Sequence, residues 1–196
     1  NLRVMNILAE TTNLIAEGEV MQLMNSNDPE LDEASYFQVI YCKTAKLFEA
    51  ATRAPAVLAG SAPAIEQALA DYGRYLGTAF QIIDDVMDYT ADSSAMGKNV
   101  GDDLAEGKVT LPLIHTLRQA DAAERALLVE AVVERNGLEK LEHILAIMQR
   151  HDAFEYSRQR AQQEVDKARQ ALQVLPDSPY REALLALADM AVARNS

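Results

Sequence analysis

The chain has 196 residues, of which 49% are hydrophobic and 24% charged, and its formal net charge is −12. This length and apolar content favour one globular domain with a sizeable core, and they argue against a disordered or fibrous protein. The acidic balance excludes nucleic acid as a partner, and no stretch reaches the ~20 apolar residues of a transmembrane segment, so we expect a cytoplasmic protein.

Helical periodicity continues through nearly the whole sequence, with apolar residues at i, i+3, i+4 and i+7 and no alternating runs typical of strands. The fold class is therefore predicted to be all-α. In chain order, the predicted helices cover residues 1–24, 31–58, 63–89, 111–117, 122–134, 138–150, 154–175 and 180–193. The segment 90–108, rich in Asp, Gly and Ser, is predicted to be a loop. Long loops in compact domains are usually functional.

Four polar side chains share one face, about 100° wide, of the helix predicted for 63–89: Gln81, Asp84, Asp85 and Asp88. Gly73 and Gly77 fall on the same face, where we expect them to leave open space. Like charges one turn apart destabilise a helix by about 0.2–0.5 kcal/mol, and a helix C-terminus disfavours anions. A hard divalent cation that shares ligands with a substrate phosphate would offset this cost, which suggests Mg²⁺. The alternative is a solvated acidic helix end.

Three lysines complement these carboxylates. Lys98 and Lys108 each follow a glycine in the loop 90–108, so that the backbone there can approach a ligand closely. Lys43 interrupts the apolar stripe of the helix predicted for 31–58, and Thr44 stands beside it. A phosphate held between lysines and a metal ion is chemically coherent. The alternatives are solvent-facing loop lysines and a Lys43 side chain that extends out to water.

Taken together, these motifs resemble the trans-isoprenyl diphosphate synthase family. The resemblance covers essentially the whole chain, and residues 71–117 are similar to the long-chain, octaprenyl-type members that make quinone side chains. Four segments carry it: the second aspartate-rich motif at Phe80-Gln81 and Asp84-Asp85-x-x-Asp88, the Lys-Thr pair at Lys43-Thr44, the loop lysines Lys98 and Lys108, and the central helix segment Gly18 to Leu23. Glu19 stands where many relatives carry glutamine.

The resemblance implies an isoprenoid synthase-like helical bundle and a homodimer. It also implies a reaction, in which an allylic diphosphate such as farnesyl diphosphate ionises and alkylates isopentenyl diphosphate to give a long-chain all-trans polyprenyl diphosphate. Two sets of residues would serve it. The implied catalytic and Mg²⁺-binding residues are Asp84, Asp85 and Asp88, with Lys43 as a further catalytic residue. The implied diphosphate-binding residues are Lys43, Thr44, Gln81, Lys98 and Lys108.

The sequence also departs from the family pattern. The first aspartate-rich motif, the Gly-Gly-Lys-Arg-type site for isopentenyl diphosphate and the Arg-Arg pair do not occur in it. Because Asn1 opens directly into a helical pattern, we expect residues 1–196 to be the C-terminal part of a single synthase domain, without its N-terminal helices and inactive alone. Three alternatives stay open: a terpene cyclase, a non-catalytic regulatory subunit of a heteromeric synthase, and a plain helical scaffold.

Overall fold

The computed structural model describes residues 1–90 and 100–194, and all regular structure within these ranges is helical. The all-α prediction is confirmed. The first half contains α1 (Leu2–Asn25), α2 (Glu33–Ile40), a π-helical turn (Tyr41–Ala45), α3 (Lys46–Leu58) and α4 (Pro63–Thr90). The second half contains α6 (Asp102–Ala105), α7 (Leu111–Gln119), α8 (Ala122–Val133), α9 (Leu141–Arg150), α10 (Ala153–Ala171) and α11 (Pro179–Ala193), with 3₁₀ turns at Gly137–Lys140 and Leu172–Val174.

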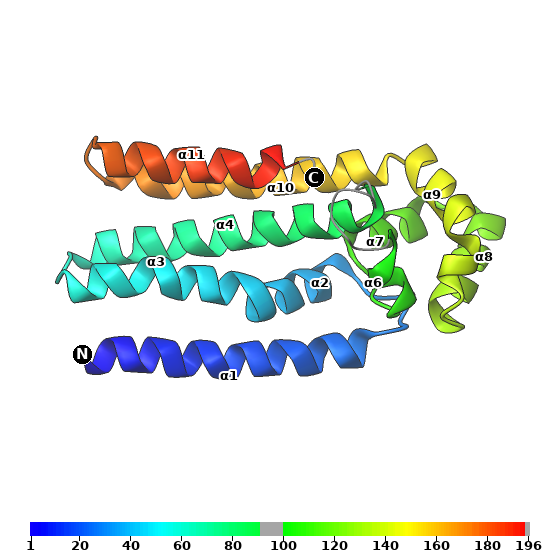
Figure 1. The fold of residues 1–196 in the computed structure, drawn as a ribbon, viewed down its shortest axis with the longest axis horizontal. Helices are drawn as coiled ribbons and strands as arrows, with labels where there is room; N and C mark the ends of the chain where they lie inside the picture. Colours follow the sequence, from blue (N-terminus) through cyan, green and yellow to red (C-terminus); the bar gives the residue numbers. More distant parts are fainter. Residues whose placement is uncertain (91–99, 195–196) are drawn as a thin grey trace.

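The long helices run side by side in layers, and α4 occupies the middle (Figure 1). It packs mainly against α10 on one side and α3 on the other, while α1 covers α3 and the π-helical turn. The shorter helices α7, α8 and α9 gather at one end of the bundle (Figure 1). This arrangement brings the C-terminal end of α4, with its aspartates, to the junction between the long helices and the short ones.

The hydrophobic core follows α4 because that helix is apolar on most of its circumference, which is typical of a helix buried on several sides. Ile82 and Ile83 are fully buried within it, and the core continues through α7 and α10. The Tyr72 hydroxyl donates a hydrogen bond to the Leu184 carbonyl at 2.7 Å and so attaches α11 to α4. None of the described helices is both long and apolar enough to cross a membrane.

Two glycines of α4 allow α3 to pack very closely. A Cβ atom on Gly73 would lie 2.2 Å from Thr52 Oγ1 and 2.4 Å from the Phe48 carbonyl oxygen, and one on Gly77 would lie 2.7 Å from Ala45 Cα. The expectation that these glycines leave open space is therefore wrong. Atoms of α3 and of the π-helical turn fill the space, so the glycines serve helix packing and the ligand cavity lies nearer the aspartates.

The region predicted as one helix over 31–58 is instead interrupted by the π-helical turn. Helix α2 starts after Asp32, whose side chain accepts a hydrogen bond from Ser35 N at 2.8 Å. The loop predicted for 90–108 also differs, since its described part contains the short helix α6. Both deviations involve residues beside the aspartates, where tertiary contacts override the local pattern.

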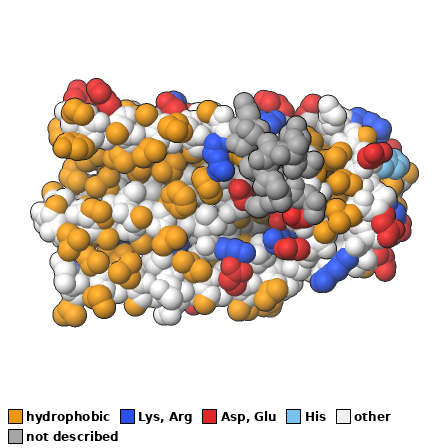
Figure 2. All heavy atoms as spheres, viewed as in Figure 1, with side chains coloured by type: hydrophobic (Ala, Val, Ile, Leu, Met, Phe, Trp, Pro, Cys, Tyr) orange, Lys and Arg blue, Asp and Glu red, His pale blue; other side chains and the backbone are white. Residues whose placement is uncertain are grey.

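The surface facing the viewer in Figure 2 is divided into two parts. Apolar side chains dominate the half formed by the long helices, and charged groups gather toward the α7–α9 end. Exposed apolar residues on that half include Leu2 and Met5 on α1 and Leu187 and Met190 on α11.

Candidate active site

One cavity of about 250 Å³ joins most of the residues singled out in the sequence. Its walls come from α1, the segment between α1 and α2, α2, the π-helical turn, α4, α6 and the segment that follows α6. The lining includes six predicted site residues: Lys43, Thr44, Gln81, Asp84, Asp85 and Lys108. Asp88 does not line it, and Lys98 lies outside the described residues. The cavity thus brings two lysines and two aspartates from distant parts of the chain to one place.

Lys43 and Thr44 stand on the π-helical turn, a distortion often found at functional sites. Gly18 allows α1 to pack closely against this turn, because a Cβ at that position would lie 2.8 Å from Lys43 N. The Lys43 ammonium donates to Gln22 Oε1 at 2.6 Å and pairs with Glu19 Oε2 at 3.1 Å. Helix α1 therefore holds Lys43 at the cavity wall through one neutral and one acidic partner.

Asp85 is the most enclosed of the three aspartates, with an exposed fraction of 4%. Its Oδ2 accepts a hydrogen bond from the Tyr36 hydroxyl at 2.6 Å, and its Oδ1 accepts one from Gln81 Nε2 at 2.7 Å. Burial, followed by the negative charge of Asp103, raises the pKa of Asp85 to about 8, although both hydrogen bonds lower it. Asp85 therefore connects α4 to α2 as well as lining the cavity.

Asp84 and Asp88 have different surroundings although they flank Asp85 on the same helix. Asp84 is half-buried and lines the cavity. Asp88 Oδ2 accepts a hydrogen bond from Asp103 N at 3.2 Å, and its carbonyl accepts one from Gly101 N at 2.9 Å. Burial and the charge of Asp103 raise the pKa of Asp88 to about 6. Asp88 thus anchors the start of α6, which the sequence pattern did not indicate.

Residues 1–148 match the family model described as polyprenyl synthetase. The chain belongs to this family. It is 53% identical over 195 residues to the octaprenyl diphosphate synthase of Haemophilus influenzae. The matched region covers 100% of this chain and 59% of that protein. It is also 44% identical over 180 residues to an all-trans-nonaprenyl-diphosphate synthase of Rhodobacter capsulatus, covering 92% of this chain and 55% of that protein.

Solved structures of the family share the fold. A polyprenyl synthase from Caulobacter crescentus, complexed with calcium and isoprenyl diphosphate, superposes with a TM-score of 0.95 at 40% identity, covering 100% of this chain and 60% of that one. A decaprenyl diphosphate synthase from Rhodobacter capsulatus gives a TM-score of 0.93 at 44% identity, covering 100% and 61%. The chain thus spans about 60% of the length of these structures.

In this family member, Lys108 has two acidic partners. Its ammonium lies 2.9 Å from Asp103 Oδ1 and 2.8 Å from Glu106 Oε2. Burial alone would lower the pKa of Lys108, but the hydrogen bonds to Glu106 and Asp103 outweigh burial and raise it. Lys108 and Lys43 therefore both face the cavity while engaged with carboxylates, which an incoming anion would have to displace.

Sequence reasoning missed two residues of the site. Tyr36 was not singled out in the sequence, yet its hydroxyl donates a hydrogen bond to Asp85. Asp103 lines the cavity, and its negative charge raises the pKa values of Asp85, Asp88 and Lys108. The signal for Asp103 was its place between two glycines in an acidic segment close to Lys108. Tyr36 carried no local signal, because only the packing of α2 on α4 brings it to Asp85.

The donor set fits a hard divalent cation, since Asp84, Asp85 and Asp103 offer carboxylate oxygens to one cavity. Within residues 1–90 and 100–194, however, no three His, Cys, Asp or Glu side chains converge closely enough to hold a metal ion by themselves. A cation bound here would therefore take further ligands from a bound diphosphate and from water.

Proposed function

We propose that this chain is the C-terminal part of a trans-polyprenyl diphosphate synthase. The enzyme would condense isopentenyl diphosphate with an allylic diphosphate, such as farnesyl diphosphate, to a long-chain all-trans product of the octaprenyl type for quinone side chains. The observation that carries the proposal is the convergence of Lys43, Lys108, Asp84 and Asp85 on one cavity. Family membership and the identity to octaprenyl diphosphate synthases support it.

In this proposal the chain's own residues bind and orient the allylic diphosphate. Lys43 and Lys108 supply positive charge to it, and Lys98 joins them from the loop. Thr44 and Gln81 position the phosphate oxygens through a hydroxyl and an amide that already contact each other at 2.8 Å. Preorganised cations of this kind stabilise the charge that develops on a departing pyrophosphate, so that no side-chain nucleophile is needed.

The proposed cofactor is Mg²⁺, with Asp84, Asp85 and Asp88 of the aspartate-rich motif as its carboxylate residues. Asp84 and Asp85 already line the cavity, whereas Asp88 accepts a hydrogen bond from Asp103 N and would have to turn from α6 to reach the ion. When bound, this ion neutralises the negative charge of the leaving pyrophosphate. A relative whose crystal structure is complexed with calcium and isoprenyl diphosphate supports the proposal of a divalent ion.

The homodimer and the cytoplasmic location are also proposals that rest on the family resemblance. Because the 196 residues lack the first aspartate-rich motif and the basic site for isopentenyl diphosphate, we expect them to bind diphosphates weakly and to turn over nothing by themselves. Condensation of the two substrates by this chain alone would contradict that expectation.

The test is a Mg²⁺-dependent condensation assay on the complete gene product with farnesyl and isopentenyl diphosphates. Asp84→Ala is expected to lower kcat/KM by at least ~100-fold, because the ion that would neutralise the leaving pyrophosphate loses a ligand. Asp71→Ala, on the same helix but outside the cavity lining, is the matched control and should stay near wild type. A gene product that is folded and inert toward both substrates would overturn the synthase proposal in favour of a regulatory subunit or a scaffold.

A further inference from the structure

The contact between Tyr36 and Asp85 is unusual for both residues. Each side chain belongs to a residue with an exposed fraction of 4%. The Tyr36 hydroxyl oxygen lies 2.6 Å from Asp85 Oδ2, although the two residues are 49 positions apart in the sequence. A buried hydroxyl needs a hydrogen-bond partner, and a buried carboxylate needs donors for both of its oxygens. Tyr36 and Gln81 supply these donors from opposite sides, so the carboxyl plane of Asp85 is held in one orientation.

The same contacts continue toward the lysine side of the cavity. Gln81 donates to Asp85 with its amide nitrogen and accepts from the Thr44 hydroxyl with its amide oxygen. Thr44 is the neighbour of Lys43 on the π-helical turn. A chain of three hydrogen bonds, Tyr36 to Asp85 to Gln81 to Thr44, therefore runs from the carboxylates of α4 to the residue beside Lys43. It links α2 and the π-helical turn to one face of α4.

We propose that Tyr36 is a positioning residue that holds Asp85 in the orientation needed at the metal side of the cavity. Through Gln81 and Thr44, this orientation is coupled to the diphosphate side. The inference rests on the proposed function, in which Asp85 helps to hold a divalent cation beside a diphosphate. Groups that hydrogen-bond to metal-binding carboxylates commonly determine metal affinity in this way.

A tyrosine with a purely structural role would behave differently, and the chain provides one for comparison. Tyr72 has an exposed fraction of 1%, and its hydroxyl donates to the Leu184 carbonyl at 2.7 Å, outside the cavity lining. Tyr36→Phe and Tyr72→Phe each remove one oxygen and one buried hydrogen bond. Only Tyr36→Phe releases a carboxylate at the proposed metal site. A difference in Mg²⁺ affinity between the two variants therefore reports the positioning of Asp85 and not a general loss of stability.

The experiment titrates Mg²⁺ calorimetrically into the complete gene product in the presence of inorganic pyrophosphate. We expect Tyr36→Phe to weaken Mg²⁺ binding by about tenfold, as loss of a partner of a metal-binding carboxylate does elsewhere. Tyr72→Phe should bind Mg²⁺ like wild type. Thermal unfolding of both variants in EDTA measures the loss of stability that they share. In the condensation assay, the Tyr36→Phe defect should shrink at high Mg²⁺, whereas a folding defect would not.

Equal Mg²⁺ affinities for wild type, Tyr36→Phe and Tyr72→Phe would overturn the positioning role. Asp84→Ala is included so that this result can be separated from failure of the proposed function. If Asp84→Ala also binds Mg²⁺ and pyrophosphate like wild type, the proposed site itself is wrong. If only Asp84→Ala loses binding, the site stands and Tyr36 is structural.

A second variant keeps the test decisive if Tyr36→Phe fails to fold. Gln81→Met removes the other hydrogen bond to Asp85 while preserving side-chain length. At saturating pyrophosphate, which offsets the loss of the proposed Gln81–diphosphate contact, it should raise the Mg²⁺ concentration needed for half-saturation in the same direction as Tyr36→Phe. An unchanged Mg²⁺ requirement in this variant would contradict the hydrogen-bonded chain as a positioning device.

Discussion

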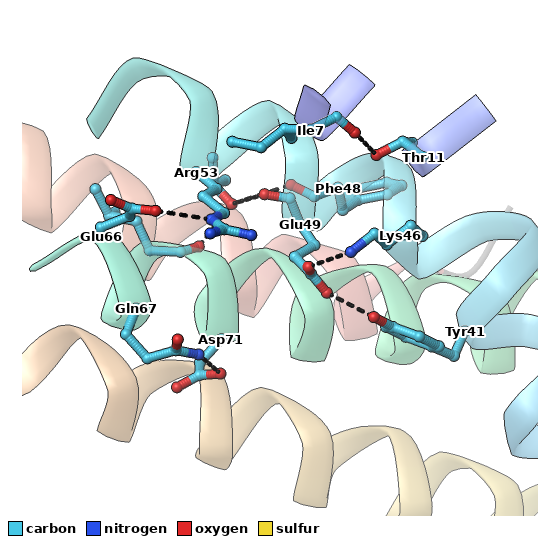
Figure 3. A network of polar contacts seen from close by, with 12 residues as sticks. Ile7, Thr11, Tyr41, Lys46, Phe48, Glu49, Arg53, Glu66, Gln67 and Asp71 are labelled. Carbon is cyan, nitrogen blue, oxygen red and sulfur yellow. Dashed lines mark hydrogen bonds and ion pairs between the residues drawn. The ribbon is translucent and has the colours of Figure 1, made fainter. Parts of the chain in front are cut away.

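The two ends of α4 hold buried carboxylates in opposite ways. At the end away from the cavity, Glu66 is buried between Arg3 and Arg53, with oxygen–nitrogen distances of 2.7 Å and 3.0 Å. Figure 3 shows the contact of Glu66 with Arg53 and a second ion pair, in which Lys46 lies 2.6 Å from Glu49. At the cavity end, Asp85 accepts hydrogen bonds from the neutral side chains of Tyr36 and Gln81, and burial, followed by its acidic neighbours, raises its pKa.

The different surroundings of Glu66 and Asp85 suggest that one carboxylate stabilises the fold and the other serves a ligand. Hydrogen bonds from Arg3 and Arg53 lower the pKa of Glu66, so that this carboxylate is stabilised as an anion by its own fold. Burial and neighbouring negative charge raise the pKa of Asp85 to about 8, so the fold leaves this group short of positive charge. Buried groups with strongly shifted pKa values in a cavity mark functional sites. The cavity end is therefore the part of α4 that is suited to receive a cation.

The sharpest test of this comparison uses two lysines one turn apart. Lys43 lines the cavity, whereas Lys46 does not line it, is buried and pairs with Glu49 (Figure 3). Lys43→Ala in the complete gene product should lower kcat/KM by roughly 100- to 1,000-fold, as loss of one preorganised charge does in other enzymes. Lys46→Ala should reduce thermal stability and leave the KM for the allylic diphosphate near wild type. Equal kinetic defects in both variants would contradict the assignment of Lys43 to ligand binding and of Lys46 to stability.

The close packing of α3 on α4 gives the next largest effect. Gly73→Ala should destabilise the protein by about 3 kcal/mol, because its Cβ would collide with the Phe48 carbonyl and Thr52. Gly60→Ala provides a contrast, since no atom lies within 4 Å of a Cβ there and only its φ of +66° is unfavourable. We expect that variant to cost about 1 kcal/mol. Urea unfolding of both variants measures the difference, and equal losses would refute the steric explanation.

The two buried carboxylates should also give stability a pH dependence of opposite sign. The pKa of Asp85 is raised on folding from 3.8 to about 8, so the folded state retains its proton and stability falls as pH rises from about 4 to 8. In EDTA, Asp85→Asn should therefore stabilise the protein by about 1–3 kcal/mol at pH 8 and by much less at pH 5.

Glu66 supplies the control for that measurement. Because its pKa is lowered on folding, it contributes stability that is present above its usual pKa of 4.5 and is lost as pH falls. Glu66→Gln should thus be less stable than wild type at pH 7 and approach it in acid. Denaturant melts at several pH values test both signs, and parallel profiles for the two variants would show that the ends of α4 do not differ.

The smallest effect concerns the acidic partner of Lys43. Glu19 is about half-exposed and lies 3.1 Å from the Lys43 ammonium. In the proposed function it would compete there with an incoming diphosphate. Glu19→Gln should strengthen pyrophosphate binding by about two- to fivefold, in line with the 0.2–1 kcal/mol of exposed ion pairs. Calorimetry at two salt concentrations measures this, because screening should shrink the gain. A loss of affinity would show that Glu19 orients Lys43 instead of competing for it.

The sequence by itself determined the helical fold, most helix boundaries and six of the polar residues that line the cavity. These features follow from local causes, because apolar periodicity and breaker residues act over a few positions. The aspartate-rich motif and the Lys43-Thr44 pair could likewise be found from their chemistry and spacing. The structure describes no position for Lys98, so its role stays a prediction.

Only the tertiary structure decided which partners these residues have. Tyr36 meets Asp85, Glu19 meets Lys43, and Asp103 meets Lys108, across helices whose relative placement no local pattern contains. The glycines of α4 show the same limit, since their position on the aspartate face suggested space that atoms of α3 and of the π-helical turn fill. Packing assigns each side chain its burial and its neighbours, and these two quantities determine whether a charge stabilises the fold or remains available for a ligand.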